Sequence, residues 1–236
     1  MCKLKILMRD KLVVLTGAGI SVESGIKTFR DAGGLWEGHD IMDVASPIGW
    51  NKNPALVLDF YNQRRRQLSE VMPNLAHHKL VELEARFHTT IITQNVDNLH
   101  ERAGSSDIIH LHGELTKSRG CYDVQTLYDC QGDIQMGDLA ADGSQMRPHI
   151  VWFGESVPMI EKAVEIISEA SILLIIGTSL QVYPAAGLIA YAPLGIPIYY
   201  IDPNPQLSYE LAQLKSLTLI AKSATEGIVE FCEGYF

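Results

Sequence analysis

Glycines and hydroxyl-bearing residues are concentrated in residues 17–30, whose sequence is GAGISVESGIKTFR. The run follows the apolar segment 12–15, and a buried strand that ends in Gly-Ala-Gly can bring backbone N–H groups close to a phosphate. Val22 stands where the usual dinucleotide motif has its third glycine. The run therefore predicts a nucleotide site, and it adds a hydroxyl-bearing turn that a plain hydride-transfer cofactor loop does not need.

Three further polar clusters come directly after apolar segments that are typical of buried strands. Open α/β sheets bind their ligands at the carboxyl ends of the strands, so we expect these clusters to meet residues 17–21 at one edge of the sheet. The clusters are Gln94, Asn95 and Asp97 after residues 89–93, His112 after residues 108–111, and Thr178 and Ser179 after residues 172–176.

His112 is the candidate proton acceptor, because an imidazole titrates near neutral pH and can move protons. A single histidine is more often a hydrogen-bonded core residue, but the neighbouring polar clusters favour a catalytic role. Asn95 and Asp97 offer an amide and a carboxylate, which suit hydroxyl groups and a carboxamide. Asp97 can also cap the helix expected near Asn98, and for Asn95 the turn-forming and ligand-binding interpretations stay open.

The apolar segments and the helical spacing between them indicate the fold class. Segments that are apolar at successive positions suit strands covered on both faces, so we predict an α/β fold with a doubly wound, Rossmann-like parallel sheet. Residues 31–53 and 113–146 break the alternation and predict a smaller inserted module. We expect the sheet domain to comprise residues 1–30, 74–112 and 151–236, and the small domain residues 31–73 and 113–150. Strands are expected at residues 12–15, 89–93, 108–111, 172–176 and 196–201, and helices at Pro54–Glu70 and residues 74–86, 159–169, 205–214 and 225–233, with a further helix that begins near Pro184.

Composition excludes several classes of function. The 236 residues are 47% hydrophobic and 20% charged, as in an ordinary globular protein. A net charge of −9 argues against a general nucleic-acid surface, which needs clustered lysine and arginine. The N-terminal stretch MCKLKILMRDK is too charged for a signal peptide, and no apolar run is long enough for a membrane span. The four cysteines form no CxxC pair, so we expect a cytoplasmic protein with reduced thiols.

Six motifs, taken together and in order, resemble the sirtuin family of NAD-dependent protein deacylases, and in particular its bacterial class III, desuccinylase-like branch. They are residues 17–30, GGLW at 33–36, TQNVDNLHERAG at 93–104, LHGEL at 111–115, RPHIVWFGE at 147–155 and GTSLQVYPAAG at 177–187. The resemblance implies NAD as co-substrate. It also implies that NAD is bound by Gly17, Ala18, Gly19, Ser21, Thr28, Phe29, Arg30, Trp36, Gln94, Asn95, Asp97, Gly177, Thr178, Ser179, Asn204 and Ala224.

The same resemblance implies the reaction. The acyl oxygen of a modified protein lysine displaces nicotinamide from the ribose, and His112, with Asn95 beside it, acts as general base for a ribose hydroxyl. The products are free lysine, nicotinamide and O-acyl-ADP-ribose. The substrate peptide would lie between two strand edges and add to them through main-chain hydrogen bonds. The residues implied in substrate binding there are Val151, Phe153, Gly154, Glu155 and Val182.

Tyr61 and Arg64 lie three residues apart on the predicted helix Pro54–Glu70 and therefore share a face. They resemble the Tyr-x-x-Arg pair of the sirtuin branch that prefers succinyl, malonyl or glutaryl lysine, and Ala45 matches the small residue that widens its acyl site. A phenol and a guanidinium can bind a terminal carboxylate. The alternative is a solvated basic face, which is how we interpret Arg65 and Arg66.

The chain differs from the family pattern in its cysteines. Sirtuins usually carry two cysteine pairs that hold a structural zinc ion between the HGE and RPH motifs. That interval contains only Cys121 and Cys130 here, and neither belongs to a CxxC pair. We therefore expect no zinc, and a small domain held together by packing and hydrogen bonds.

Two other functions remain compatible with these motifs. The first is mono-ADP-ribosyl transfer, which would use the same NAD site but would give Tyr61 and Arg64 no evident role. The second is an NAD-binding interaction module without catalysis, against which the presence of both His112 and Asn95 argues.

Overall fold

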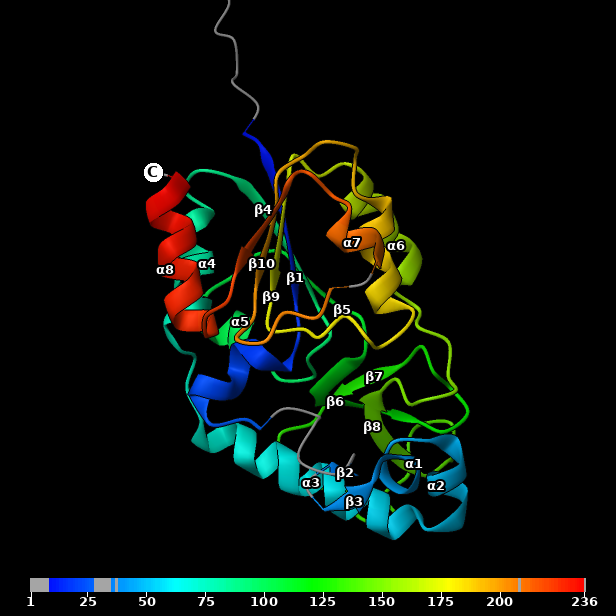
Figure 1. The fold of residues 1–236 in the computed structure, drawn as a ribbon. Coiled ribbons are helices and arrows are strands. Elements are labelled where there is room, and N and C mark those ends of the chain that lie inside the picture. Colours follow the sequence, from blue (N-terminus) through cyan, green and yellow to red (C-terminus); the bar gives the residue numbers. More distant parts are fainter. Residues whose placement is uncertain (1–8, 28–34, 37, 208, 236) are drawn as a thin grey trace, which may run out of the picture.

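A six-stranded parallel sheet lies at the centre of the larger part of the molecule (Figure 1). The computed structural model describes residues 9–27, 35–36, 38–207 and 209–235. Across the sheet the strands are β11 (Leu217–Ile220), β10 (Ile198–Ile201), β9 (Ile172–Ile176), β1 (Lys11–Thr16), β4 (His88–Thr93) and β5 (Ile108–His110). The predicted doubly wound α/β class is confirmed.

Helices cover both faces of this sheet, which explains why its strands are apolar at successive positions (Figure 1). Helices α4 (Leu75–Leu83) and α8 (Ala224–Tyr235) pack on one face, and α6 (Ile160–Ser168), α7 (Tyr209–Ala212) and the 3₁₀ helix η2 (Ala185–Tyr191) on the other. Within β1, Leu12 and Val14 belong to the first core, and Val13 and Leu15 to the second. Successive side chains of this strand thus pack alternately into the two cores.

The chain reverses direction across the sheet at β1. From β1 it proceeds to β4 and β5 on one side, and then crosses to β9, β10 and β11 on the other. The loops that follow β1 and β9 therefore leave the sheet side by side. This is the switch point at which parallel α/β sheets form a ligand crevice.

Below the sheet in Figure 1, a smaller group of elements faces the carboxyl ends of the strands. It contains the antiparallel sheet β7 (Leu127–Asp129), β6 (Gly113–Gly120) and β8 (Met146–Ile150), and the helices α1 (Ile41–Val44), α2 (Pro47–Lys52) and α3 (Pro54–Glu70). The short strands β2 (Leu35–Trp36) and β3 (His39–Asp40) pair beside them. Their core combines aliphatic side chains with the aromatic rings of Trp36, Phe60, Tyr61 and Trp152.

Element boundaries differ from the prediction mainly at the ends. α3 begins and ends at the predicted residues, because Asn53 caps its first turn and Pro54 occupies the first position. α7 is shorter than the predicted residues 205–214, and Pro184 precedes a 3₁₀ helix rather than an α-helix. The edge strand β11 was not predicted, because half of its short sequence is exposed. No helix of the described residues is long and apolar enough to cross a membrane.

Candidate active site

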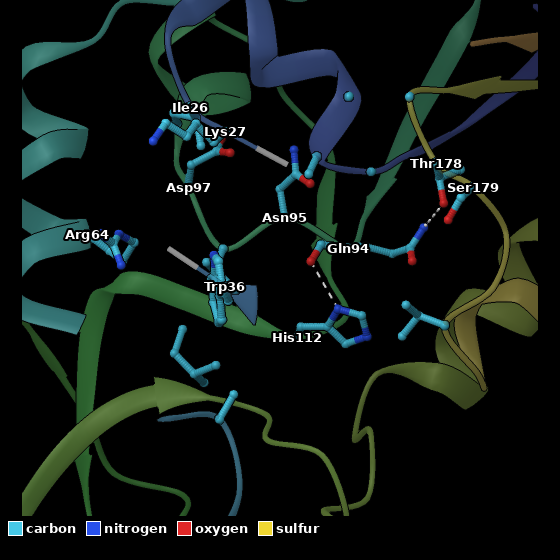
Figure 2. A pocket seen from close by; sticks show the side chains of 18 of the residues that line it. Ile26, Lys27, Trp36, Arg64, Gln94, Asn95, Asp97, His112, Thr178 and Ser179 are labelled. Carbon is cyan, nitrogen blue, oxygen red and sulfur yellow. Dashed lines mark hydrogen bonds between the residues drawn. The ribbon is translucent and has the colours of Figure 1, made fainter. Parts of the chain in front are cut away.

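A cavity of about 460 Å³ opens at the switch point, between the sheet and the smaller group of elements (Figure 2). Its size is that of a small-molecule site. The loops after β1, β4 and β9 line one side, and α3 with the segment after β8 lines the other. Of the predicted site residues, those that line it are Gly17, Ala18, Gly19, Trp36, Ala45, Tyr61, Arg64, Gln94, Asn95, Asp97, His112, Val151, Phe153, Gly154, Glu155, Gly177, Thr178, Ser179, Val182 and Ala224.

The glycines of residues 17–19 allow two loops to touch through their backbones. The N–H of Gly17 donates to the Ile176 carbonyl at 3.0 Å, and the N–H of Gly19 donates to the Gly177 carbonyl at 2.8 Å. A Cβ atom on Gly19 would lie 2.5 Å from the Gly177 Cα atom, and Gly177 has a φ of +62°. These two N–H groups therefore hold the loops together, a role that differs from the phosphate contact expected of them.

Ser21, Asn95 and Asp97 form one buried hydrogen-bonded group. The Ser21 hydroxyl donates to Asp97 Oδ2 at 3.0 Å and accepts from the Asn95 amide at 3.2 Å. Asp97 Oδ1 also accepts the N–H of Leu99, so this carboxylate caps α5 (Leu99–Ala103) as well. Burial raises the pKa of Asp97, and the hydrogen bonds from Leu99 and Ser21 oppose that effect. Ser21 does not line the cavity, and its hydroxyl instead fixes the side-chain amide of Asn95, which does.

His112 is oriented by the backbone. Its Nδ1 lies 3.0 Å from the Gln94 carbonyl, which can only accept, so Nδ1 carries the proton and Nε2 has a free lone pair (Figure 2). Burial lowers the pKa of His112, and the bond to Gln94 opposes this effect. The imidazole is therefore neutral at pH 7, as a general base must be. The Gln94 amide donates to Thr178 Oγ1 at 2.9 Å, which joins the loops after β4 and β9.

Tyr61 and Arg64 face the cavity from α3, with Ala45 nearby in the lining. The Tyr61 hydroxyl accepts the indole N–H of Trp152 at 3.1 Å, so its own proton can be donated to another group. Burial strongly raises the pKa of Tyr61, which keeps the phenol protonated. The Arg64 guanidinium lies 4.7 Å from the centre of the Phe60 ring. A phenol donor and a cation are thus placed on one wall.

A buried ion pair shapes the segment after β8. Arg147 donates to both oxygens of Glu155, at 2.8 and 3.2 Å, and its guanidinium stacks 3.1 Å from the centre of the Trp152 ring. Burial opposes ionisation of Glu155, but the hydrogen bonds and charge of Arg147 outweigh it, and the pKa is lowered. Glu155 also accepts the backbone N–H of Trp152. This carboxylate therefore anchors the loop internally, in addition to lining the cavity.

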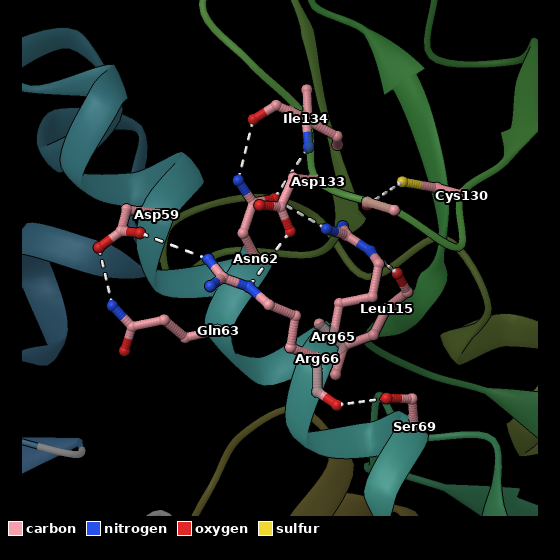
Figure 3. Close-up of polar contacts among 11 residues, drawn as sticks. Asp59, Asn62, Gln63, Arg65, Arg66, Ser69, Leu115, Cys130, Asp133 and Ile134 are labelled. Atoms are coloured by element: carbon pink, nitrogen blue, oxygen red, sulfur yellow. Dashed lines mark hydrogen bonds and ion pairs between the residues drawn. The ribbon is translucent and has the colours of Figure 1, made fainter.

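The structure corrects the interpretation of Arg65, which was expected at the surface. Its side chain is 4% exposed and donates to the Leu115 carbonyl at 2.8 Å and to Asn62 Oδ1 at 2.9 Å (Figure 3). Position 65 faces β6, whereas Arg66 projects outward and pairs with Asp59 and Asp133. Only Arg66 is the surface charge that the sequence predicts.

Several predicted residues lie elsewhere, and several lining residues were not predicted. Asn204 does not line the cavity, whereas its neighbours Asp202 and Pro203 do. Asp202 follows β10 as the other polar clusters follow their strands, and that pattern could have identified it. Trp152, Lys27, Glu23 and Ser223 also line the cavity without having been predicted. Thr28, Phe29 and Arg30 lie outside the described residues.

The two cysteines of the small sheet do not form a zinc-binding set with the described residues around them. Cys130 is buried, donates weakly to the Gly132 carbonyl and packs against Leu58 and Ile134. Cys121 bonds to Ser144 through its backbone N–H. The described group of metal-ligating side chains is Glu101, His110 and Glu114, which contains no thiol. The expected absence of zinc stays a prediction.

Comparisons with known proteins agree with one another. The model of the Sir2 family matches residues 17–184. The chain is similar to the NAD-dependent protein deacylase of Helicobacter pylori, with 65% identity over 193 residues that cover 82% of this chain and 84% of that protein. It is also similar to the NAD-dependent protein deacylase of Bacteroides thetaiotaomicron, with 56% identity over 93% of this chain and 95% of that protein.

Solved structures show the same likeness. A Sir2 homologue in complex with NAD has a TM-score of 0.84 and 35% identity, covering 96% of this chain and 89% of that one. A mutant Sir2 homologue in complex with ADP ribose has a TM-score of 0.85 and 34% identity, covering 95% of this chain and 91% of that one.

Proposed function

The chain belongs to the Sir2 family and is an NAD-dependent protein deacylase, and on this premise we propose that it acts preferentially on succinyl and malonyl lysine, with acetyl lysine as a weaker substrate. The observation that carries the proposal is the position of Tyr61 and Arg64 on one wall of the cavity, beside Ala45. A dicarboxylic acyl group ends in a carboxylate. A protonated phenol and a guanidinium are its natural partners, whereas an acetyl group offers them nothing to bind.

The cavity residues have separate roles in this proposal. NAD would be held by the glycine loop, the segment Gln94 to Asp97 and the loop after β9, and when bound it supplies the ribose carbon that nicotinamide leaves. His112 accepts the proton of a ribose hydroxyl at Nε2, because Nδ1 is committed to the Gln94 carbonyl. Asn95, whose side-chain amide is held by Ser21 and whose backbone N–H is held by Thr93, orients the reacting groups.

The peptide that carries the modified lysine would lie against the segment after β8. Val151, Phe153, Gly154 and Glu155 line the cavity there, and Val182 lines it from the other side. The Arg147–Glu155 pair keeps this segment rigid. Recognition through the main chain would leave most of the selectivity to the acyl group.

The test compares kcat/KM for matched succinyl-lysine and acetyl-lysine peptides in the wild type and in Arg64→Met. A hydrogen bond to a charged group contributes about 1.5–3 kcal/mol, which corresponds to roughly 10- to 100-fold in rate. We expect the variant to lose that factor with the succinyl peptide and to keep its activity with the acetyl peptide.

Arg66→Met is the matched control, because Arg66 lies on the same helix but its side chain is 59% exposed. It removes the same charge without reaching the cavity and should leave both activities unchanged. Equal or better deacetylation by the wild type, unaffected by Arg64→Met, would refute the acidic-acyl preference.

A further inference from the structure

Three metal-ligating side chains from three separate elements meet outside the cavity. Glu101 lies on α5, His110 ends β5 and Glu114 lies near the start of β6. Each offers one ligand atom, and these atoms lie within 4.8 Å of one another. The Glu101 side chain is 38% exposed and that of His110 is 10% exposed, so the group is open to solvent on the side of Glu101.

His110 is held in the orientation that is usual for a metal-binding histidine. Its Nδ1 lies 3.2 Å from the Asn95 carbonyl, which can only accept, so Nδ1 donates and Nε2 points to Glu101 at 2.6 Å. In the neutral imidazole, that nitrogen and the carboxylate oxygen are both acceptors. Burial lowers the pKa of His110, but the hydrogen bond and charge of Glu101 outweigh it and raise the pKa, so a proton lies between these atoms and a metal ion that binds there displaces it. Metal-binding histidines commonly donate their other N–H to a backbone carbonyl.

The neighbouring strand adds a second imidazole to this face. In the pairing of β6 with β8, His149 stands directly opposite Glu114. Side chains of directly opposite residues in an antiparallel pair project to the same face. The buried Nδ1 of His149 has no hydrogen-bond partner among the described residues. The group and its neighbour His149 thus offer nitrogen and oxygen ligands, and none of these four side chains is a thiol.

We propose that Glu101, His110 and Glu114 form an exchangeable binding site for a divalent transition-metal ion. One imidazole and two carboxylates suit ions such as Mn²⁺ or Co²⁺, and an exposed site of three ligands leaves positions for water. The site differs from the thiolate zinc site of the family in its ligands and its place in the fold. It is also independent of the acyl preference.

Through His110, the proposed metal site is connected to the loop between β4 and α5, which lines the cavity. A metal ion between Glu101 and His110 would take the place of the hydrogen bond that now joins them. Because His110 also bonds to the Asn95 carbonyl, the ion would hold that part of the loop between β4 and α5 more firmly. His112 follows two residues later along the chain.

Titration of Co²⁺ into the full chain, after dialysis against EDTA, tests the proposal by calorimetry and absorption spectroscopy. We expect one bound ion whose spectrum lacks the charge-transfer band that thiolate ligands produce. His110→Gln and Glu114→Gln should each lower the affinity by more than about 10-fold, since even the loss of an outer partner costs that much. His88→Gln, at an exposed position on β4, is the matched control and should bind as the wild type does.

Three results would overturn the proposal. The first is the absence of saturable binding to the wild type. The second is a thiolate band, which would place the ion at a cysteine. The third is an unchanged affinity in both His110→Gln and Glu114→Gln, with circular dichroism confirming that the variants fold.

Discussion

Replacing His77 by glutamine should make the stability of this protein much less sensitive to acid. His77 is fully buried in α4, and its ring centre lies 5.0 Å from that of His100. Its Nδ1 accepts the backbone N–H of Asn74 in a capping box at the start of the helix. Glutamine is also found at this position of capping boxes, so the variant keeps an acceptor there while it removes the titrating ring.

The size of the expected change in stability follows from the pKa of His77, which burial lowers from 6.5 to about 4. The charge of His78 lowers this pKa further, and the charge of Glu101 opposes both effects. Between these values the unfolded chain binds a proton at His77 and the folded protein does not, so acid favours unfolding. Stability from this group is complete above pH 6.5 and is lost as the pH falls toward 4. At about 1.4 kcal/mol per pH unit, the loss is roughly 3 kcal/mol.

The assay is urea unfolding of the wild type and the variant between pH 7.5 and pH 4, monitored by circular dichroism, so that the range covers the interval between the two pKa values. His149, whose pKa burial also lowers, contributes to both curves. Burial and the charge of His77 both lower the pKa of His100, so the difference between the curves reports His77 together with its effect on His100. His88→Gln should follow the wild type. Two curves that stay parallel, offset by a constant amount, would show that His77 is not a buried neutral group and would refute this reasoning.

Two further predictions concern the reaction and the metal. His112→Gln should lower kcat by roughly 10²- to 10⁴-fold and leave NAD affinity within a few-fold, and an unchanged kcat would exclude His112 as the base. Because burial lowers the pKa of His112 in the free protein, the acid limb of the wild-type kcat/KM profile should lie below pH 6.5. Dialysis against EDTA should remove any bound metal without unfolding the protein, and elemental analysis should then find no zinc. A protein that depends on a structural zinc ion would instead unfold when the ion is removed.

The elements around the sheet could be predicted because their signals are local. Runs such as Ile172–Ile176 are apolar throughout, and α3 carries its own cap and its own helical period. The convergence of the polar clusters followed from the rule that parallel strands present their carboxyl ends at one edge. These inferences need no knowledge of distant contacts.

The parts that could not be predicted depend on such contacts. Arg65 looks like a surface charge in a run of three arginines, and only the fold shows that the Leu115 carbonyl and Asn62 receive its donors. Ser21 resembles a ligand-binding hydroxyl, yet it is buried behind Asn95 and Asp97. The family motif alone does not distinguish a side chain that lines the cavity from one that supports it.

Helix α3 connects the cavity wall that we propose to bind the acyl group with the small antiparallel sheet. This connection bears on how a module without two cysteine pairs is held together. In the small domain, the turns at residues 121–123 and 142–144 are linked by hydrogen bonds. The Asp142 carboxylate accepts the backbone N–H groups of Asp123 and Ser144. Each such bond contributes about 0.5–3 kcal/mol, whereas a structural zinc ion contributes roughly 10–16 kcal/mol in small peptides. These local hydrogen bonds alone therefore stabilise the small domain much less than a structural zinc ion would.

The remaining anchoring comes from α3, where residues three apart share a face. Asn62 forms two hydrogen bonds with the backbone of Ile134, and Arg65 holds the Leu115 carbonyl (Figure 3). The adjacent positions, Tyr61 and Arg64, line the cavity. One face of the helix thus secures the module while the next face presents the groups proposed to select the acyl chain. Because both faces belong to one helix, Asn62→Ala should loosen its hold on the small sheet, displace Tyr61 and Arg64, and lower the ratio of kcat/KM for succinyl-lysine to that for acetyl-lysine peptides. An unchanged ratio in a folded variant would show that the two faces are not coupled.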